Sequence, residues 1–212
     1  MTLALTSPAD TAAYACEVLP VYALPTADVQ AMAALYLAHY CQTDETIFRT
    51  DLAAKHEVLL LRHAGQVVGF TTWRVDEAQH QGQAMRVLYS GDTVVHRAHW
   101  GQQALAFAWI RRMGELAAQD PAKPLCWLLL VKGHRTYKYL SVFAQRFFPH
   151  WQQDEPALAQ LAAQLAAARF SDAFHADLGI VRFAQSRGQL RPEYALPLAS
   201  EASKPSTQFF LQ

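Results

Sequence analysis

A carboxylate stands inside an expected strand near the middle of the chain. Asp92 directly follows Gly91 within the strand predicted over residues 84–96. Because burying an unpaired charge is costly, a carboxylate at such a position usually has a charged or hydrogen-bonding partner, or a chemical function. One such function is to remove the proton of an attacking amine, directly or through a water. Two structural roles stay open: a bulge or cap position after Gly91, and an ion pair with Arg86 or Arg97.

A turn and the start of a predicted helix follow this strand, at Trp100, Gly101, Gln102, Gln103 and Ala104. Such a turn aims several unpaired backbone N–H groups at one point, with the positive end of the helix dipole behind them. It can therefore hold a phosphate or a pyrophosphate. Glycine lets a phosphate approach the backbone closely, and Gly101 is the one glycine of the turn. An ordinary helix N-terminus is the alternative.

Other reactive groups are weaker candidates. His96 and His99 have an H-x-x-H spacing, but no CxxC or HExxH motif accompanies them, so we predict no metal site. Ser90 lacks the G-x-S-x-G context of a nucleophile elbow. Cys126 lies in an apolar stretch, where its thiol would be inert. Three widely spaced cysteines indicate thiols in a reducing compartment rather than disulfides.

The elements that position these groups follow from periodicity and turn residues. The first part of the chain predicts a strand, two helices with Thr26 capping the first, and three strands joined by short turns, which form an antiparallel meander. The expected ranges are 14–23 for the first strand, 26–40 and 44–54 for the helices, and 57–62, 66–75 and 84–96 for the meander.

The second part of the chain predicts a long helix packed against the sheet and then a strand over the apolar run 125–131, buried on both faces and parallel to its predecessor. An aromatic-rich helix ends at Pro149. The Ala-rich helix after it is a lid, a dimer element or a solvated surface helix. The expected ranges are 101–118, 134–148 and 155–169 for the helices, and 178–183 and 189–195 for further strands.

The composition excludes several classes of protein. The 212 residues carry 18 Lys and Arg against 18 Asp and Glu, and 52% are apolar. A nucleic-acid binder needs a cationic excess that this balance lacks, and a charged fraction of 17% argues against disorder. No stretch reaches the roughly 20 apolar residues of a membrane helix, and residues 1–10 lack a secretory signal. We expect a cytoplasmic protein with one domain over 1–196 and a loosely ordered tail over 197–212.

The order of elements over about residues 14–149 resembles the GNAT superfamily of acyl-CoA-dependent N-acyltransferases. The most specific piece is VVHRAHWGQQAL at 94–105, which is similar to the end of the family's fourth strand and its pyrophosphate loop, usually R/Q-G-x-G-x-G/A. Gly101 and Gln102 fit this pattern. Trp100 replaces the basic or amide residue, and two usual glycines are absent. The resemblance implies an α/β fold of α+β type, a mixed, mostly antiparallel twisted sheet flanked by helices.

The resemblance also implies where a donor would bind. The strands over 84–96 and 125–131 would splay apart to admit a pantetheine arm. Backbone groups of Val94 and Val95 would hold that arm as an added strand is held, and the thioester would lie near Asp92. The turn over 100–104 would hold the pyrophosphate.

Two further roles are implied at the start of the helix over 134–148. Many members of the superfamily carry a tyrosine there that protonates the leaving thiolate. Tyr137 is the first candidate and Tyr139 the second, and they point to different helix faces. Arg135 would orient an acidic substrate or the pyrophosphate, unless it is a solvated charge.

These expectations combine into one function and one alternative. Acetyl-CoA or a longer acyl-CoA would be the co-substrate, without a metal, and an acyl carrier protein is a second donor. The acceptor would be the primary amine of a small or lipidic molecule. The alternative is a non-catalytic binding module that kept the fold and lost CoA binding, which the missing glycines favour. The sequence leaves open whether the protein forms a homodimer.

Overall fold

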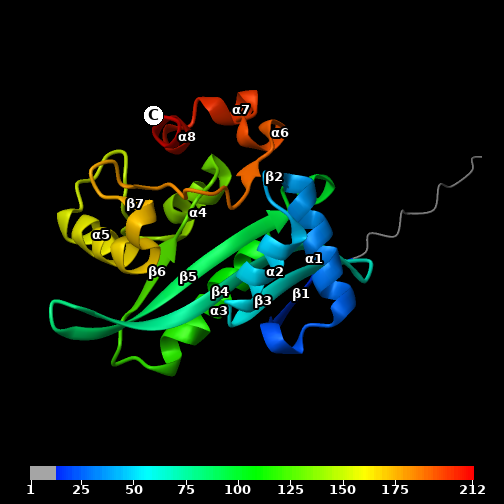
Figure 1. Ribbon diagram of the computed structural model, residues 1–212, viewed down its shortest axis with the longest axis horizontal. Coiled ribbons are helices and arrows are strands. Elements are labelled where there is room, and N and C mark those ends of the chain that lie inside the picture. The colour runs from blue at the N-terminus through cyan, green and yellow to red at the C-terminus, as the bar shows by residue number, and fades with distance from the viewer. Residues whose placement is uncertain (1–12) are drawn as a thin grey trace, which may run out of the picture.

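The computed structural model describes residues 13–212, so the sequence expectation about residues 1–10 lies outside the described part. Its centre is a five-stranded sheet in the order β1-β3-β4-β5-β6 (Figure 1). Neighbouring strands are antiparallel except β5 and β6, which are parallel. The strands are β1 (Ala15–Pro20), β3 (Glu57–His63), β4 (Gln66–His80), β5 (Gln83–Val95) and β6 (Leu125–Leu129). The predicted mixed, mostly antiparallel sheet is confirmed.

The remaining elements surround this sheet. The helices are α1 (Thr26–His39), α2 (Glu45–Ala53), α3 (Ala104–Gln119), α4 (His134–Phe143), α5 (Pro156–Phe170), α6 (Pro192–Ala195), α7 (Ala199–Ala202) and α8 (Pro205–Phe210). Two-residue strands form two small pairs, β2 (Tyr40–Cys41) with β9 (Gln189–Leu190), and β7 (Phe174–His175) with β8 (Ile180–Val181). Single 3-10 turns cover Val21–Ala23, Arg97–His99 and Ser171–Ala173. Pro25 occupies the N-cap position of α1 without a side-chain capping hydrogen bond, and Thr26 is the first helical residue, so the predicted cap at Thr26 is wrong.

Two tight hairpins build the meander. Ala64 and Gly65 have φ values of 49° and 76° between β3 and β4, and Gln81 and Gly82 have values of 50° and 79° between β4 and β5. Positive φ at both central residues is the conformation that lets a two-residue turn follow the twist of its strands. The predicted hairpins are thus confirmed, and β4 and β5 extend beyond the sheet as a long arm (Figure 1).

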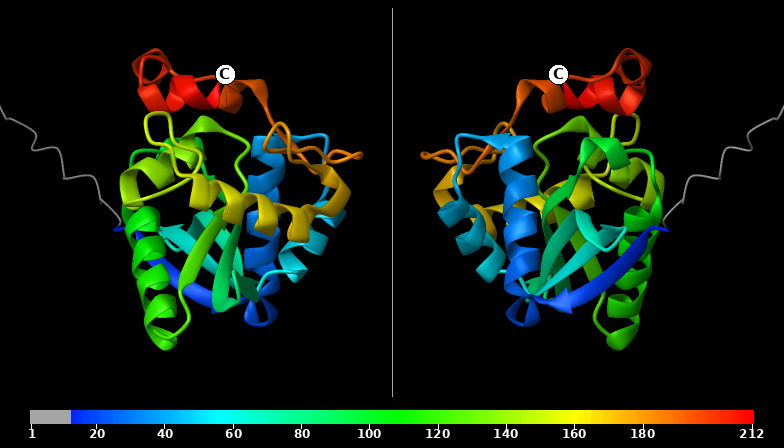
Figure 2. Two further views of the ribbon diagram at one scale, coloured as in Figure 1. Left: turned by 90° about the vertical axis from the view of Figure 1, so that its left-hand side faces the viewer. Right: turned by 90° about the vertical axis from the view of Figure 1, so that its right-hand side faces the viewer.

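Alternating side chains of β3 separate two apolar layers. Val58 and Leu60 belong to the core under α1 and α2, whereas Leu59 and Leu61 belong to the core under α3. This follows from the period of two in a strand. Figure 2 shows α1 and α3 on opposite sides of the sheet.

The apolar strand β6 differs from its prediction, because it is the last strand of the sheet and its residues are only half-buried. Cys126 and Leu128 contact α5 through Leu161 and Leu165, while Trp127 packs toward α3. The prediction that this strand is buried on both faces is therefore wrong. The Ala-rich helix α5 covers β6.

The C-terminal third of the described chain also differs from expectation. Helix α4 ends at Phe143, before the predicted end at 148. Residues 197–212, expected as a loosely ordered tail, form α7 and α8, and the rings of Phe209 and Phe210 pack on Tyr137 at 5.9 and 6.0 Å between centroids. Helices α6–α8 form a layer of their own beside the C-terminal end of β5 (Figures 1 and 2).

Replacing Leu61 by Ala is expected to lower the free energy of unfolding by about 2 to 5 kcal/mol, because Leu61 is fully buried between the sheet and α3 and truncation leaves a cavity. Phe107 lies on the outer face of α3 and is 61% exposed, so Phe107→Ala is the matched control with a change below about 0.5 kcal/mol. Urea unfolding of both variants measures the difference. Equal losses in the two would contradict the assigned packing of α3.

Candidate active site

A cavity of about 1580 Å³ opens where β5 and β6 cease to pair. Pairing between the two strands runs from Arg86 with Leu125 to Ser90 with Leu129. Beyond that point β6 has ended, while β5 continues to Val95. Its last five residues, 91–95, all line the cavity. One backbone edge of β5 therefore borders an open volume instead of a neighbouring strand.

Asp92 lies in a β-bulge at this divergence. Trp73 pairs with Ser90 and Thr71 with Thr93, so β5 carries one residue more than β4 over this stretch. A Cβ at Gly91 would lie 2.6 Å from Cε of Lys55, so glycine is required for the lysine to pass there. The bulge that the sequence left open as a role for Asp92 is present, and Asp92 is among the residues that line the cavity.

Neither arginine suggested as a partner of Asp92 pairs with it. Arg86 donates instead to carbonyls at the end of α3, including Leu116 O at 2.7 Å and Asp120 O at 3.0 Å. Arg97 is exposed and lies 5.8 Å from the ring centroid of Trp100. The ion-pair interpretation of Asp92 is therefore wrong for both residues.

The electrostatic surroundings of Asp92 suit a proton acceptor. Burial raises the pKa of this carboxyl to about 6; the charge of Asp51 also raises it, and the charges of Lys132 and Lys55 lower it. At neutral pH the carboxylate form prevails, with a pKa close enough to the working pH for proton exchange.

Two lysines near Asp92 were not identified from sequence. Lys55 has a side chain only 1% exposed and is bonded to the carboxylate of Asp51. Lys132 donates from Nζ to the carbonyl of Arg187 at 2.8 Å and stands 4.8 Å from the ring centroid of Tyr40. Burial lowers the pKa of Lys132, and the charge of Asp92 opposes that shift. No motif marks these lysines, because the fold brings them together from separate elements.

The predicted phosphate-binding turn lies on the cavity, where Trp100, Gly101, Gln102 and Gln103 line it and Ala104 does not. Gly101 has a φ of 89°, a conformation that favours glycine. The side chain of Gln102 accepts from the N–H of Leu105 at 3.2 Å and so uses one of the free donors of α3.

The Trp100 side chain occupies the end of the exposed strand edge. Its Nε1 donates to the carbonyl of Val95 at 2.8 Å. His39 places Nε2 at 3.1 Å from the same oxygen. Val94 and Val95, whose backbone groups the resemblance assigns to the donor, both line the cavity, but the carbonyl of Val95 is already bonded within the chain.

Arg135 lines the cavity beside Trp100, with its guanidinium 4.6 Å from the ring centroid. It is no free surface charge. Glu201 accepts from its Nη2 at 2.7 Å and its Nε at 3.2 Å, and Tyr194 O accepts from its Nη1 at 2.8 Å. Burial raises the pKa of Glu201, but hydrogen bonds from Leu198, Arg135 and His134 bring it down to about 2. Arg135 thus anchors the C-terminal helices.

The two candidate tyrosines occupy different places. Tyr137 is 2% exposed and does not line the cavity, because its hydroxyl donates to Pro149 O at 2.7 Å on the side covered by α8. Tyr139 lines the cavity and packs with the core under α3. Burial raises the pKa of Tyr139 above its ordinary value of 10.0, which keeps its hydroxyl protonated. Of the two tyrosines, Tyr139 is the one that borders the cavity.

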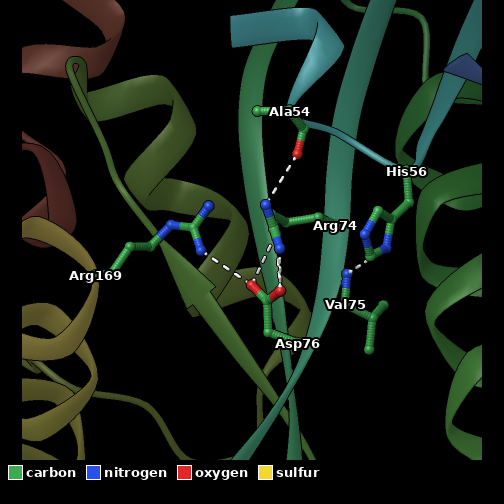
Figure 3. Close-up of polar contacts among 6 residues, drawn as sticks. All are labelled: Ala54, His56, Arg74, Val75, Asp76 and Arg169. Atoms are coloured by element: carbon green, nitrogen blue, oxygen red, sulfur yellow. Dashed lines mark hydrogen bonds and ion pairs between the residues drawn. The ribbon is translucent and has the colours of Figure 1, made fainter.

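A charged network fixes the end of α5 against the sheet. Asp76 on β4 accepts from Arg74 Nε at 2.8 Å and from Arg169 Nη1 at 3.0 Å (Figure 3). Arg74 also donates to Ala54 O at 3.2 Å. Arg169 and Arg74 both line the cavity, so this network forms part of its wall.

Two further expectations from the sequence concern metal binding and membrane spans. Within residues 13–212, no group of three His, Cys, Asp or Glu side chains is arranged to hold a metal ion. No helix in this part of the chain is long and apolar enough to cross a membrane.

Comparisons with known proteins identify the fold. No protein-family model and no curated protein matches the sequence. Among solved structures, an aminoglycoside N-acetyltransferase in complex with CoA has a TM-score of 0.50 at 8% identity, covering 66% of this chain and 92% of that one. The chain has the GNAT fold.

Two other solved GNAT-fold structures are similar at lower scores. A ribosomal-protein-alanine N-acetyltransferase from Brucella melitensis biovar Abortus 2308 has a TM-score of 0.48 at 18% identity, with 68% of this chain and 99% of that chain covered. A GNAT family N-acetyltransferase from Escherichia coli in complex with CoA has a TM-score of 0.42 at 17% identity, with coverages of 67% and 71%.

Replacing Asp92 by Asn is expected to raise the free energy of unfolding at pH 8 by about 1 to 3 kcal/mol and to leave it unchanged at pH 3.5. The folded state raises the pKa of Asp92 from 3.8 to about 6, so holding the charge costs stability above pH 6, whereas both states are protonated below 3.8. Urea unfolding at the two pH values measures this. Exposed Asp154→Asn is the control, and a gain that does not depend on pH would contradict the assignment.

Proposed function

We propose that this GNAT-fold chain is an acyl-CoA-dependent N-acyltransferase. It would move an acetyl or longer acyl group from a thioester to the primary amine of a small molecule by direct attack. The observation that carries the proposal is the shared cavity at the divergence of β5 and β6. An open strand edge, Asp92, the turn over 100–103 before α3 and Tyr139 all border it.

The donor side rests on the β5 edge and the start of α3. Amides of a pantetheine arm can pair with backbone groups of the edge, as an added strand would. Alternate residues of β5 face β4, and because His96 N–H donates to Val68 O, Val94 also faces β4 whereas Thr93 and Val95 face the open edge. Since the carbonyl of Val95 is bonded to Trp100, we assign this pairing to Thr93. The turn at 100–103 would hold the pyrophosphate with backbone donors and the dipole of α3. The aminoglycoside N-acetyltransferase of similar fold was solved with CoA, which supports a CoA donor.

The chemical step uses two groups of the chain. Asp92 takes a proton from the amine as its nitrogen attacks the thioester carbonyl and the C–N bond forms. The C–S bond then breaks, and the thiolate takes a proton from the hydroxyl of Tyr139. Lys132 lowers the pKa of Asp92 and so maintains the carboxylate near neutral pH.

A second candidate is a binding module that kept the cavity without donor binding. Two observations favour the binding module. Trp100 covers the end of the strand edge, and Glu201 is paired with Arg135, which lies beside Trp100. Both contacts lie on the side where the donor would enter, so donor binding separates the two functions.

Isothermal titration with acetyl-CoA and octanoyl-CoA is expected to show saturable binding of both, because the strand edge and the helix start recognise the part that the two donors share. Free pantetheine, which lacks the pyrophosphate, should bind more weakly. No binding of either acyl-CoA would contradict a CoA donor and favour the binding module.

Tyr139→Phe is expected to lower kcat by about 100-fold or more, because a positioned acid contributes at least that much, and to leave acyl-CoA affinity unchanged. Tyr137→Phe makes the same chemical change outside the cavity. It should keep kcat within about twofold and lose about 1 kcal/mol of stability with its hydrogen bond to Pro149. Steady-state kinetics and urea unfolding test the pair, and a larger loss of kcat in Tyr137→Phe would overturn the assignment.

A further inference from the structure

One wall of the cavity is both aromatic and cationic. Tyr89, Phe170 and Phe183 form a row of edge-to-face rings, with centroids 6.0 and 6.2 Å apart. Arg169 stands 3.6 Å from the ring centroid of Tyr89, and Arg187 stands 4.4 Å from that of Phe183. All five side chains line the cavity. The wall therefore offers flat apolar surface with a guanidinium at each end.

The two arginines of this wall differ in what they already bind. Arg169 forms an ion pair with Asp76, and Asp76 also forms one with Arg74 (Figure 3). Within residues 13–212, the Arg187 guanidinium has no ion pair or hydrogen bond, and only its backbone carbonyl is used, by Lys132 and Tyr36. Its five N–H donors remain free for a ligand.

Near Asp92 the cavity is lined by negatively charged side chains. Asp92 and Asp51 both line it, and the charge of Lys55 is engaged by Asp51. The charges of both Asp92 and Arg187 act on Lys132, so all three groups lie in one part of the cavity. A bound molecule there would meet both the carboxylate of Asp92 and the unpaired guanidinium of Arg187.

We propose that the acceptor is an amine that also carries an aromatic or other apolar body and an acidic group. The amine lies at Asp92, the body packs on Phe170 and Phe183, and the acid accepts hydrogen bonds from Arg187. An arginine binds a carboxylate through two parallel hydrogen bonds, and aromatic rings pack favourably edge to face. The cations Arg169, Arg187 and Lys132 disfavour a polycationic acceptor. This inference rests on the proposed acyltransferase function.

The residues of this pocket come from two parts of the chain. Asp92 and Tyr89 belong to β5, which also borders the donor side, whereas Phe170 ends α5 and Phe183 and Arg187 follow it. The segment after α4 would therefore supply acceptor specificity, while β5 and α4 supply Asp92 and Tyr139.

Initial rates of CoA release from acetyl-CoA test the acceptor class with a matched set of amines. The set contains phenylalanine, 4-(2-aminoethyl)benzoic acid, 2-phenylethylamine and spermidine. At least one of the two acids should have a kcat/KM about 10 to 100 times that of 2-phenylethylamine, the range of one charged hydrogen-bonded pair. Spermidine should be the poorest acceptor.

Arg187→Gln should remove most of the preference for the acids, by lowering their kcat/KM toward that of 2-phenylethylamine in the same variant. Arg182→Gln, an exposed arginine that does not line the cavity, is the control and should leave the preference unchanged. An equal or higher rate with 2-phenylethylamine or spermidine, or a preference that survives in Arg187→Gln, would overturn the proposal while leaving the acyltransferase function intact.

Calorimetric titration of the same amines into the CoA-saturated protein provides a second readout. Binding of the acids that depends on Arg187, without turnover of any amine, would support the acceptor class and contradict the acyltransferase function. Equal binding of acids and 2-phenylethylamine, with or without turnover, would contradict the acceptor class.

Discussion

The end of pairing between β5 and β6 is the constraint on which the rest of the site depends. Parallel pairing stops at Ser90 and Leu129, and the bulge at Gly91 and Asp92 follows at once. The bulge is possible because Lys55 passes over a residue without a side chain. From this divergence come the cavity, the open backbone edge and the partial burial that raises the pKa of Asp92.

Local signals in the sequence predict the sheet well and the site only in part. The hairpin at Ala64 and Gly65 and the parallel strand β6 follow from turn chemistry and the crossover rule. The choice between Tyr137 and Tyr139 does not, because spacing shows only that they face different sides of α4. Helix α8 packs on the side of α4 that Tyr137 faces, and no local pattern of α4 contains that information.

The C-terminal third of the described chain has two roles around the cavity. Through Glu201 and Tyr194 it holds Arg135 next to Trp100. Through Phe183 and Arg187 it forms one wall of the cavity. In the proposed function, β5 and α4 supply the reacting groups, and the segment after α4 determines which molecules reach them. The chain has no net charge and therefore no long-range field of one sign, so binding of a charged ligand depends on local cations such as Arg135 and Arg187.

In the proposed function an acyl donor enters between β5 and β6 beside Asp92. A crystal structure of the protein with CoA would locate the donor. We expect pantetheine amides paired with the open edge of β5, the pyrophosphate at the turn over 100–103, and the thiol near Asp92 and Tyr139. CoA bound elsewhere on the molecule, with the β5 edge left unpaired, would contradict this placement.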